Sequence, residues 1–123
     1  MKLEKDNPII VKSMNFAIRC VRLREYLIKE RSEYVMSKQL FRSGTSIGAN
    51  IREAIRGQSK SDFGAKMNIA LKEASESEYW IELLRNTDYI TESQSDNLLI
   101  DCVELIKMLT SIVKTTFESE NNK

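Results

Sequence analysis

The segment between Ser59 and Asn86 carries the spacing that most restricts how this chain can fold. Apolar or small side chains recur there at alternating intervals of four and three residues. They are Phe63, Met67, Ala70, Ala74, Ser77, Ile81 and Leu84. A sustained heptad pattern of this kind is typical of a helix that lies nearly parallel to its neighbours. Because such a helix must bury its seam against other helices, the pattern predicts a helical bundle.

Three further segments show helical spacing, so the sequence predicts an all-α, antiparallel, up-down-up-down four-helix bundle. The predicted helices cover residues about 8–30, 37–57, 60–86 and 91–118. The first is expected to bury the stripe Ile10, Met14, Ala17, Val21 and Ile28, and the fourth carries a second stripe at Leu99, Ile106 and Val113. At 123 residues, the chain is predicted to form one domain, 1–123, with frayed ends at 1–6 and 119–123.

Each predicted helix start has a side chain that can accept a hydrogen bond from the first turn. The expected caps are Asn7 followed by Pro8, then Ser37, then Ser59 with Asp62, then Thr91 with Gln94. Gly57 is expected to end the second helix, since glycine is common just beyond a helix C-terminus.

The second helix is unusually rich in small residues, which let another backbone approach closely. These are Ser43, Gly44, Thr45, Ser46, Gly48 and Ala49. Each glycine costs a helix interior about 1 kcal/mol relative to alanine, so its presence calls for a packing reason. Two explanations stay open: tight packing inside one subunit, or close approach at a subunit interface or ligand.

Several classes of chemistry lack their usual residues. The sequence has no histidine, which removes the commonest general base and metal ligand. Cys20 and Cys102 lie in amphipathic patterns and are expected to be buried free thiols. No phosphate-binding glycine loop is present. We therefore predict no enzymatic activity, no catalytic residues, no metal and no cofactor.

The remaining candidates for chemistry have simpler explanations. Glu73, Glu76 and Glu78 are interpreted as a solvated helix face, and Glu53 and Glu82 as partners for arginine in half-buried pairs. The aromatic cluster of Tyr79, Trp80 and Tyr89 favours core packing at one end of the bundle, with base stacking as the alternative.

Charge is distributed unevenly along the chain. Residues 1–60 hold 13 Lys and Arg against 6 Asp and Glu, whereas residues 61–123 hold 6 against 12. The net charge of the whole chain is only +1. A basic half and an acidic half in one small domain indicate a role for charge in recognition.

No apolar run reaches the length of a membrane span, and the N-terminal residues lack the apolar core of a secretory signal. We therefore expect a cytoplasmic protein that does not enter the membrane.

The run from Gln39 to Ala54 resembles the motif of small four-helix-bundle proteins encoded in intervening sequences of large-subunit ribosomal RNA genes, formerly filed as ribosomal proteins. Its polar positions include Arg42, Ser46, Asn50 and Glu53. The likeness continues through Glu73-Ala74-Ser75-Glu76, Tyr79 to Leu84 and Glu104 to Leu109, and it spans roughly residues 10–115. Arg52 stands where that family commonly has alanine.

This resemblance implies a homopentameric ring of bundles with no known enzymatic activity. It extends to the accessory variability protein of diversity-generating retroelements, a similar bundle that binds RNA and a reverse transcriptase. By the same resemblance, Arg42, Asn50 and Glu53 are interpreted as a polar network at the subunit boundary. Ser77 and the second stripe of the fourth helix are expected to reach a partner or a bound water.

Two functions fit these observations. In the first, the protein is a structural or protein-interaction module, and the basic helices of one subunit meet the acidic helices of the next. In the second, it binds RNA or a nucleic-acid-processing protein through its first two helices. The candidate contacts for that function are Lys12, Arg19, Arg22, Lys38, Arg42, Arg52, Arg56 and Lys60.

Overall fold

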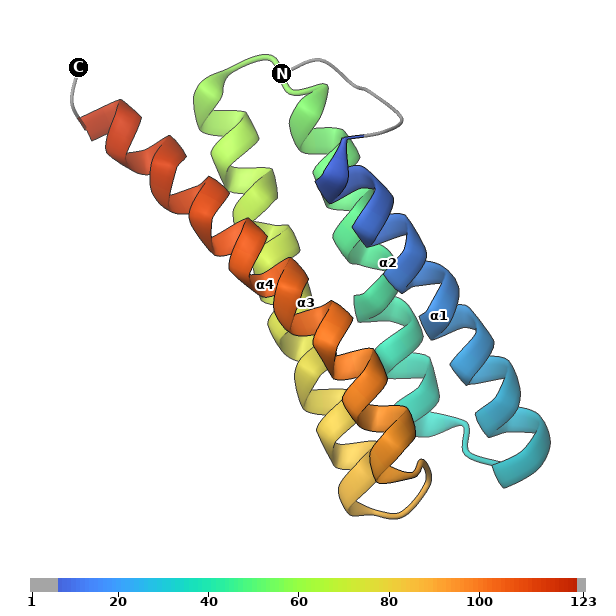
Figure 1. The fold of residues 1–123 in the computed structure, drawn as a ribbon. Coiled ribbons are helices and arrows are strands. Elements are labelled where there is room, and N and C mark those ends of the chain that lie inside the picture. The colour runs from blue at the N-terminus through green and yellow to red at the C-terminus, as the bar shows by residue number, and fades with distance from the viewer. Residues whose placement is uncertain (1–6, 122–123) are drawn as a thin grey trace.

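Four long helices make up nearly all of the computed structural model, which describes residues 7–121, with side chains to residue 118. They are α1 (Pro8–Arg31), α2 (Val35–Ile55), α3 (Lys60–Asn86) and α4 (Glu92–Asn121). Consecutive helices run in opposite directions (Figure 1) and pack in the order α1, α2, α3, α4. No strand occurs within residues 7–121. The predicted all-α up-down-up-down bundle is therefore confirmed.

The bounds of α3 are those predicted, and the other helices differ by a few residues. α2 begins and ends two residues earlier than expected. α4 is helical to Asn121, which includes residues 119–121 of the predicted frayed end. The other residues predicted to fray, 1–6 and 122–123, lie outside the described part of the chain.

Three of the four predicted caps are confirmed. Asn7 Oδ1 accepts from the backbone N–H of Ile9 at 3.2 Å, and Ser59 Oγ accepts from Asp62 N–H at 3.0 Å. Thr91 and Gln94 exchange two such bonds, of 2.8 and 3.1 Å, in a complete capping box. These local signals fix where three helices start.

The start of α2 departs from the prediction, because Glu33 caps it in place of Ser37. The buried Glu33 carboxylate accepts hydrogen bonds from three backbone N–H groups, those of Val35, Met36 and Ser37, at 2.7–3.1 Å. Ser37 lies inside the helix, where its hydroxyl donates to the Glu33 carbonyl at 2.8 Å. A negative charge at a helix N-terminus also compensates the helix dipole.

Replacing Glu33 with alanine is expected to lower the free energy of unfolding by about 2 kcal/mol, since three N–H groups lose their acceptor. Glu33→Gln keeps one acceptor oxygen and should lose about half as much. Urea denaturation at neutral pH measures both variants. An unchanged midpoint for Glu33→Ala would show that water replaces the carboxylate at no cost.

The end of α2 also differs from the prediction. Arg56 follows the last helical residue, and Gly57 donates its N–H to the Ala54 carbonyl at 3.0 Å. None of the described glycines has a positive φ. The described residues with a positive φ are Ser32 at 52° and Asp88 at 67°, in the turns after α1 and α3. Gly57 therefore lies just beyond the helix C-terminus, as expected, but without the left-handed backbone that glycine often has there.

The small residues of α2 include three that pack inside the bundle. Ser43 Oγ lies 2.8 Å from Ser77 Oγ of α3, and both residues are buried. A Cβ on Gly44 would lie 2.4 Å from Cys20 Sγ of α1, and one on Gly48 would lie 3.3 Å from Ser13 Oγ. The close approach is thus between helices of one chain for these residues. Ser77, expected to reach a partner or a water, instead bonds to Ser43 and to the Glu73 carbonyl at 2.9 Å.

α1 and α4 make the least contact of the four neighbouring pairs. Lys12 near the start of α1 pairs with Glu104 in the middle of α4 at 2.5 Å, so the last turns of α4 extend beyond α1. There they pack on α3, where Thr116 lies against Gly64. Within residues 7–121, none of the helices combines the length and hydrophobicity needed to cross a lipid bilayer.

Candidate functional site

Four of the eight basic residues proposed as nucleic-acid contacts pair with acidic groups of the same chain. Lys12 and Arg19 of α1 bind Glu104 and Asp101 of α4, the latter at 2.6 Å. Arg22 binds Glu25 one turn away at 3.0 Å. Arg42 of α2 binds Glu73 of α3 at 3.2 Å and also contacts Glu76. Much of the charge asymmetry between the two halves is therefore met inside one bundle.

Three of the other four basic residues have no acidic partner among the described residues. Lys38 and Arg52 of α2, and Arg56 directly after it, are exposed and make no side-chain hydrogen bond or ion pair with the residues that the structure describes. Lys60, at the start of α3, is engaged in an interaction. Of the eight basic residues predicted to contact nucleic acid, three are therefore exposed and without a described ion-pair partner. They lie in α2 or directly after it.

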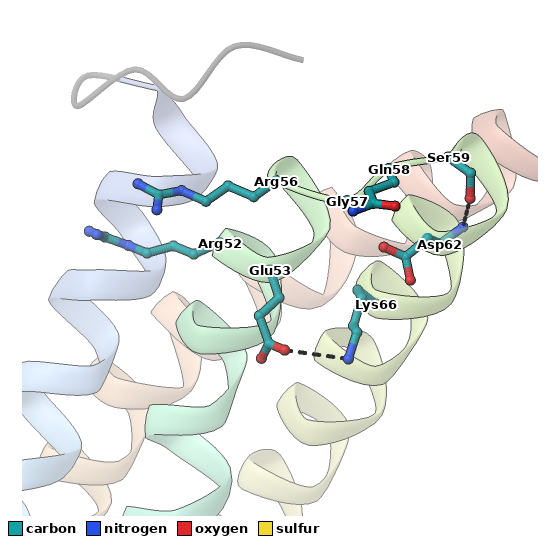
Figure 2. A pocket seen from close by; sticks show the side chains of 8 residues that line it. All are labelled: Arg52, Glu53, Arg56, Gly57, Gln58, Ser59, Asp62 and Lys66. Atoms are coloured by element: carbon teal, nitrogen blue, oxygen red, sulfur yellow. Dashed lines mark hydrogen bonds and ion pairs between the residues drawn. The ribbon is translucent and has the colours of Figure 1, made fainter.

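Arg52 and Arg56 border a shallow hollow of about 960 Å³ at the end of the bundle where α2 meets α3. Figure 2 shows the two arginine side chains extended side by side from α2, toward α1. Glu53 points the other way and binds Lys66 of α3 at 3.4 Å. The hollow therefore has the two arginines on one side, and the Glu53–Lys66 pair and the Asp62 carboxylate on the other.

The three polar residues taken from the family motif do not form one network within the chain. Arg42 binds α3, Asn50 donates to the Ser46 carbonyl at 2.8 Å, and Glu53 binds Lys66. The prediction that Glu53 pairs with an arginine is wrong, because its partner is Lys66. Glu82 is exposed and makes no ion pair with a described residue, so its predicted pairing is wrong as well.

Two of the three carboxylates interpreted as a solvated face have specific partners, whereas Glu78 pairs with none of the described residues. Glu73 and Glu76 both hold Arg42, and Glu76 also accepts from Trp80 Nε1 at 3.1 Å. Trp80 is half-buried and packs edge-on against Tyr79 with ring centroids 5.0 Å apart. Sequence periodicity missed this cluster, because the contact depends on how α2 is rotated against α3.

The aromatic residues divide between two environments. Tyr89 is half-buried under the guanidinium of Arg31, which lies 5.0 Å from the ring centre and donates to the carbonyls of Asp88 and Tyr89. This contact ties the end of α1 to the turn between α3 and α4. Tyr79, by contrast, is 56% exposed. Core packing at the bundle end therefore holds for Tyr89 and Trp80 but not for Tyr79.

Both cysteines are buried free thiols, as predicted. Burial is the main cause that raises the pKa of Cys102 to about 12, with nearby Glu78 and Asp101 adding to it. Burial likewise raises the pKa of Cys20 far above its ordinary value. Neither thiol is poised as a nucleophile at neutral pH. Among the described residues, no group of three or more Cys, Asp or Glu side chains is placed to hold a metal ion.

The outward face of α1 carries three apolar residues, one of which, Met14, belongs to the stripe that was expected in the core. Val11, Met14 and Ile18 are 38, 45 and 48% exposed. The core face of α1 is instead formed by Ile9, Ile10, Ser13, Phe16, Cys20 and Leu27. The predicted stripe through Met14 is therefore wrong in its rotation about the helix axis, and it leaves an apolar surface in solvent.

A second apolar surface lies on α4. Ile100 is 66% exposed, and with Leu99 and Val103 it lines a hollow of about 700 Å³ whose rim holds Asp96, Glu104 and Lys107. Leu99 belongs to the second stripe that was predicted for this helix. The chain thus presents two separate apolar faces, one on α1 and one on α4.

Comparison with known proteins agrees with this architecture. Residues 5–111 match a family described as 23S rRNA-intervening sequence protein. A crystal structure from Bacteroides thetaiotaomicron, of a protein with unknown function from the S23 ribosomal protein family, is 56% identical in sequence. The match covers 90% of this chain and 99% of that one, with a TM-score of 0.87. None of the curated proteins matches the chain.

Proposed function

Since the chain belongs to the 23S rRNA-intervening sequence protein family, we propose that it is a non-enzymatic, self-associating bundle whose working form is a ring of identical subunits. The observation that carries this proposal is the pair of exposed apolar faces. We call Val11, Met14 and Ile18 the α1 face, and Leu99, Ile100 and Val103 the α4 face.

Exposed apolar side chains that lie together on one face favour association, because contact removes them from water. Val11, Met14 and Ile18 follow one another at intervals of three and four, so they form a continuous stripe on the side of α1 opposite the core. The α4 face is hollowed, which suits the insertion of such a ridge.

The charged residues around the two faces are largely paired within one chain. Lys12 beside the α1 face binds Glu104 on the rim of the α4 hollow, and Asp96 on the same rim binds Arg85. Exposed ion pairs add little free energy, so the association proposed here rests on the apolar side chains.

Two different faces on one chain give a head-to-tail contact, which closes into a ring or propagates as a filament. An isologous dimer would need one face that matches itself. We propose a closed ring of five, the number that the family resemblance implies. The absence of histidine from the sequence and the high pKa of both thiols support a role without catalysis.

The proposal is tested by changing one residue of each face to glutamate and measuring mass in solution by light scattering. Five subunits of 14.2 kDa give about 70 kDa. Ile18→Glu and Ile100→Glu should each reduce the mass to that of a monomer, because the charge would be buried in an apolar contact. Ile69→Glu, at a residue 41% exposed on α3, is the matched control and should keep the ring.

A mixing experiment separates head-to-tail from isologous contact. Ile18→Glu subunits retain an intact α4 face, and Ile100→Glu subunits retain an intact α1 face. An equimolar mixture should therefore form a 1:1 dimer although neither variant associates alone. A monomeric wild-type protein at micromolar concentration, or a mixture that stays monomeric, would overturn the proposal.

A further inference from the structure

We propose that Arg52 and Arg56 form a clamp for the phosphate groups of a nucleic-acid strand, bound through its backbone and without regard to base sequence. Arg52 lies in the last turn of α2 and Arg56 directly follows the helix, four positions later, so their side chains leave the chain about one turn, ~5.4 Å, from each other. Both are exposed, and Figure 2 shows them extended in parallel. This inference goes beyond self-association, which uses α1 and α4.

Among the described residues, no carboxylate pairs with either arginine. Asp62 of α3 lines the same hollow, but Figure 2 shows it across from the arginines, whose side chains extend the opposite way. α1 has no acidic residue before Glu25, and the only one within α2 is Glu53. Glu53 leaves α2 on the side facing α3, where Lys66 holds it. Two like charges placed one turn apart repel each other, and since neither has an ion-pair partner among the side chains of residues 7–118, the pair favours an anionic ligand.

The surroundings fit a phosphate backbone better than a protein partner. Beside the arginines, the hollow is lined by Glu53, Gly57, Gln58, Ser59, Asp62 and Lys66, none of them an apolar side chain. Protein interfaces have an apolar core that excludes water, which this surface lacks. Guanidinium groups hold phosphate oxygens through two parallel N–H donors, and such contacts need no apolar wall.

Lys38 extends the basic surface along the same helix. It precedes Arg56 by 18 positions, which corresponds to about 27 Å of helix length. It is exposed and, like the arginines, makes no ion pair with a described residue. A strand that binds the clamp can therefore follow α2 toward Lys38.

Binding is measured with a fluorescent single-stranded 20-nucleotide RNA, and with DNA of the same sequence, by anisotropy from about 50 to 200 mM salt. The wild type should bind both strands with similar affinity. The double variant Arg52→Gln/Arg56→Gln should weaken binding at least about tenfold and reduce the salt dependence by about 1.4 in logarithmic slope, for two lost phosphate contacts. The matched control is the double variant Arg22→Gln/Lys29→Gln, at two exposed residues of α1. It removes the same amount of positive charge and should change the binding affinity little.

Four results would overturn the inference. The wild type fails to bind at about 50 mM salt. The two double variants lose affinity equally, which shows a diffuse charge effect. Inorganic tripolyphosphate binds as tightly as the 20-mer, which assigns the clamp to free polyphosphate. The Arg52→Gln/Arg56→Gln variant loses the oligomer in light scattering, which assigns the arginines to a subunit contact.

Discussion

Replacing Gly44 with alanine is expected to lower the free energy of unfolding by about 2 kcal/mol and the melting temperature by about 8 °C. On an exposed helix the same change would be stabilising by about 1 kcal/mol. Here the added Cβ would lie 2.4 Å from Cys20 Sγ and 3.1 Å from Cys20 Cβ. Cys20 is 1% exposed and has a single side-chain torsion, so its sulfur has no solvent to turn into. α1 and α2 must move apart instead.

Gly48→Ala is the matched control for this prediction. Its Cβ would lie 3.3 Å from the hydroxyl of Ser13, a contact that needs only a few tenths of an ångström of adjustment. The gain in helix propensity should then leave Gly48→Ala neutral or more stable than the wild type.

Combining Gly44→Ala with Cys20→Ala should recover about 1 kcal/mol beyond additivity, because the second change removes the clashing sulfur. Thermal and urea unfolding of the four proteins in this cycle measures the coupling. Equal behaviour of the two glycine variants would contradict the packing at Gly44.

The elements that sequence predicted best are those determined by local interactions. The bounds of α3 and the caps at Asn7, Ser59 and Thr91 involve residues within four positions of one another. Such signals can be read directly because neither partner depends on how distant helices pack. Glu33 is the exception, since a glutamate four residues before Ser37 is not a typical cap.

The rotation of α1 could not be predicted, because the helix carries two apolar stripes. One passes through Phe16, Cys20 and Leu27, and the other through Val11, Met14 and Ile18. Both have helical spacing, so periodicity alone cannot decide which stripe faces the core. Packing against Gly44 decides it, since Cys20 and Phe16 occupy the space that the glycine leaves open. The stripe that does not face the core, Val11, Met14 and Ile18, is the α1 face proposed for self-association.

The same limit applies to the basic residues. Sequence identified all eight, yet only the structure shows that Lys12, Arg19 and Arg42 meet acidic groups on helices far away in the chain. Arg52 and Arg56 pair with no acidic side chain of residues 7–118, and Glu53, which lies between them in sequence, turns toward α3. A charge count measures the asymmetry of the halves, whereas function depends on which charges remain unpaired.

The two thiols should resist modification in the folded protein by at least about a thousandfold relative to the unfolded chain. The thiolate is the reactive species, and a pKa of about 12 against an ordinary 9.0 leaves about a thousandth of the usual thiolate on Cys102 at pH 8. Cys102 is also 0% exposed and donates to the Ala74 carbonyl at 3.3 Å. Labelling with an aromatic disulfide should therefore proceed at the rate of unfolding. In Ser111→Cys, which adds a thiol on the exposed side of α4, one thiol should react at once.

The same pKa values predict that stability falls at alkaline pH. In the unfolded chain the thiols ionise near pH 9.0, whereas Cys102 in the folded chain ionises only near 12. A pKa raised by folding gives stability that is complete below pH 9 and is lost as the pH rises toward 12. The comparison is with Cys20→Ala/Cys102→Ala, which lacks both thiols and retains every other ionisable group of the chain. The double variant should lose less stability between pH 9 and 11, whereas parallel curves would show that the thiols ionise equally in both states.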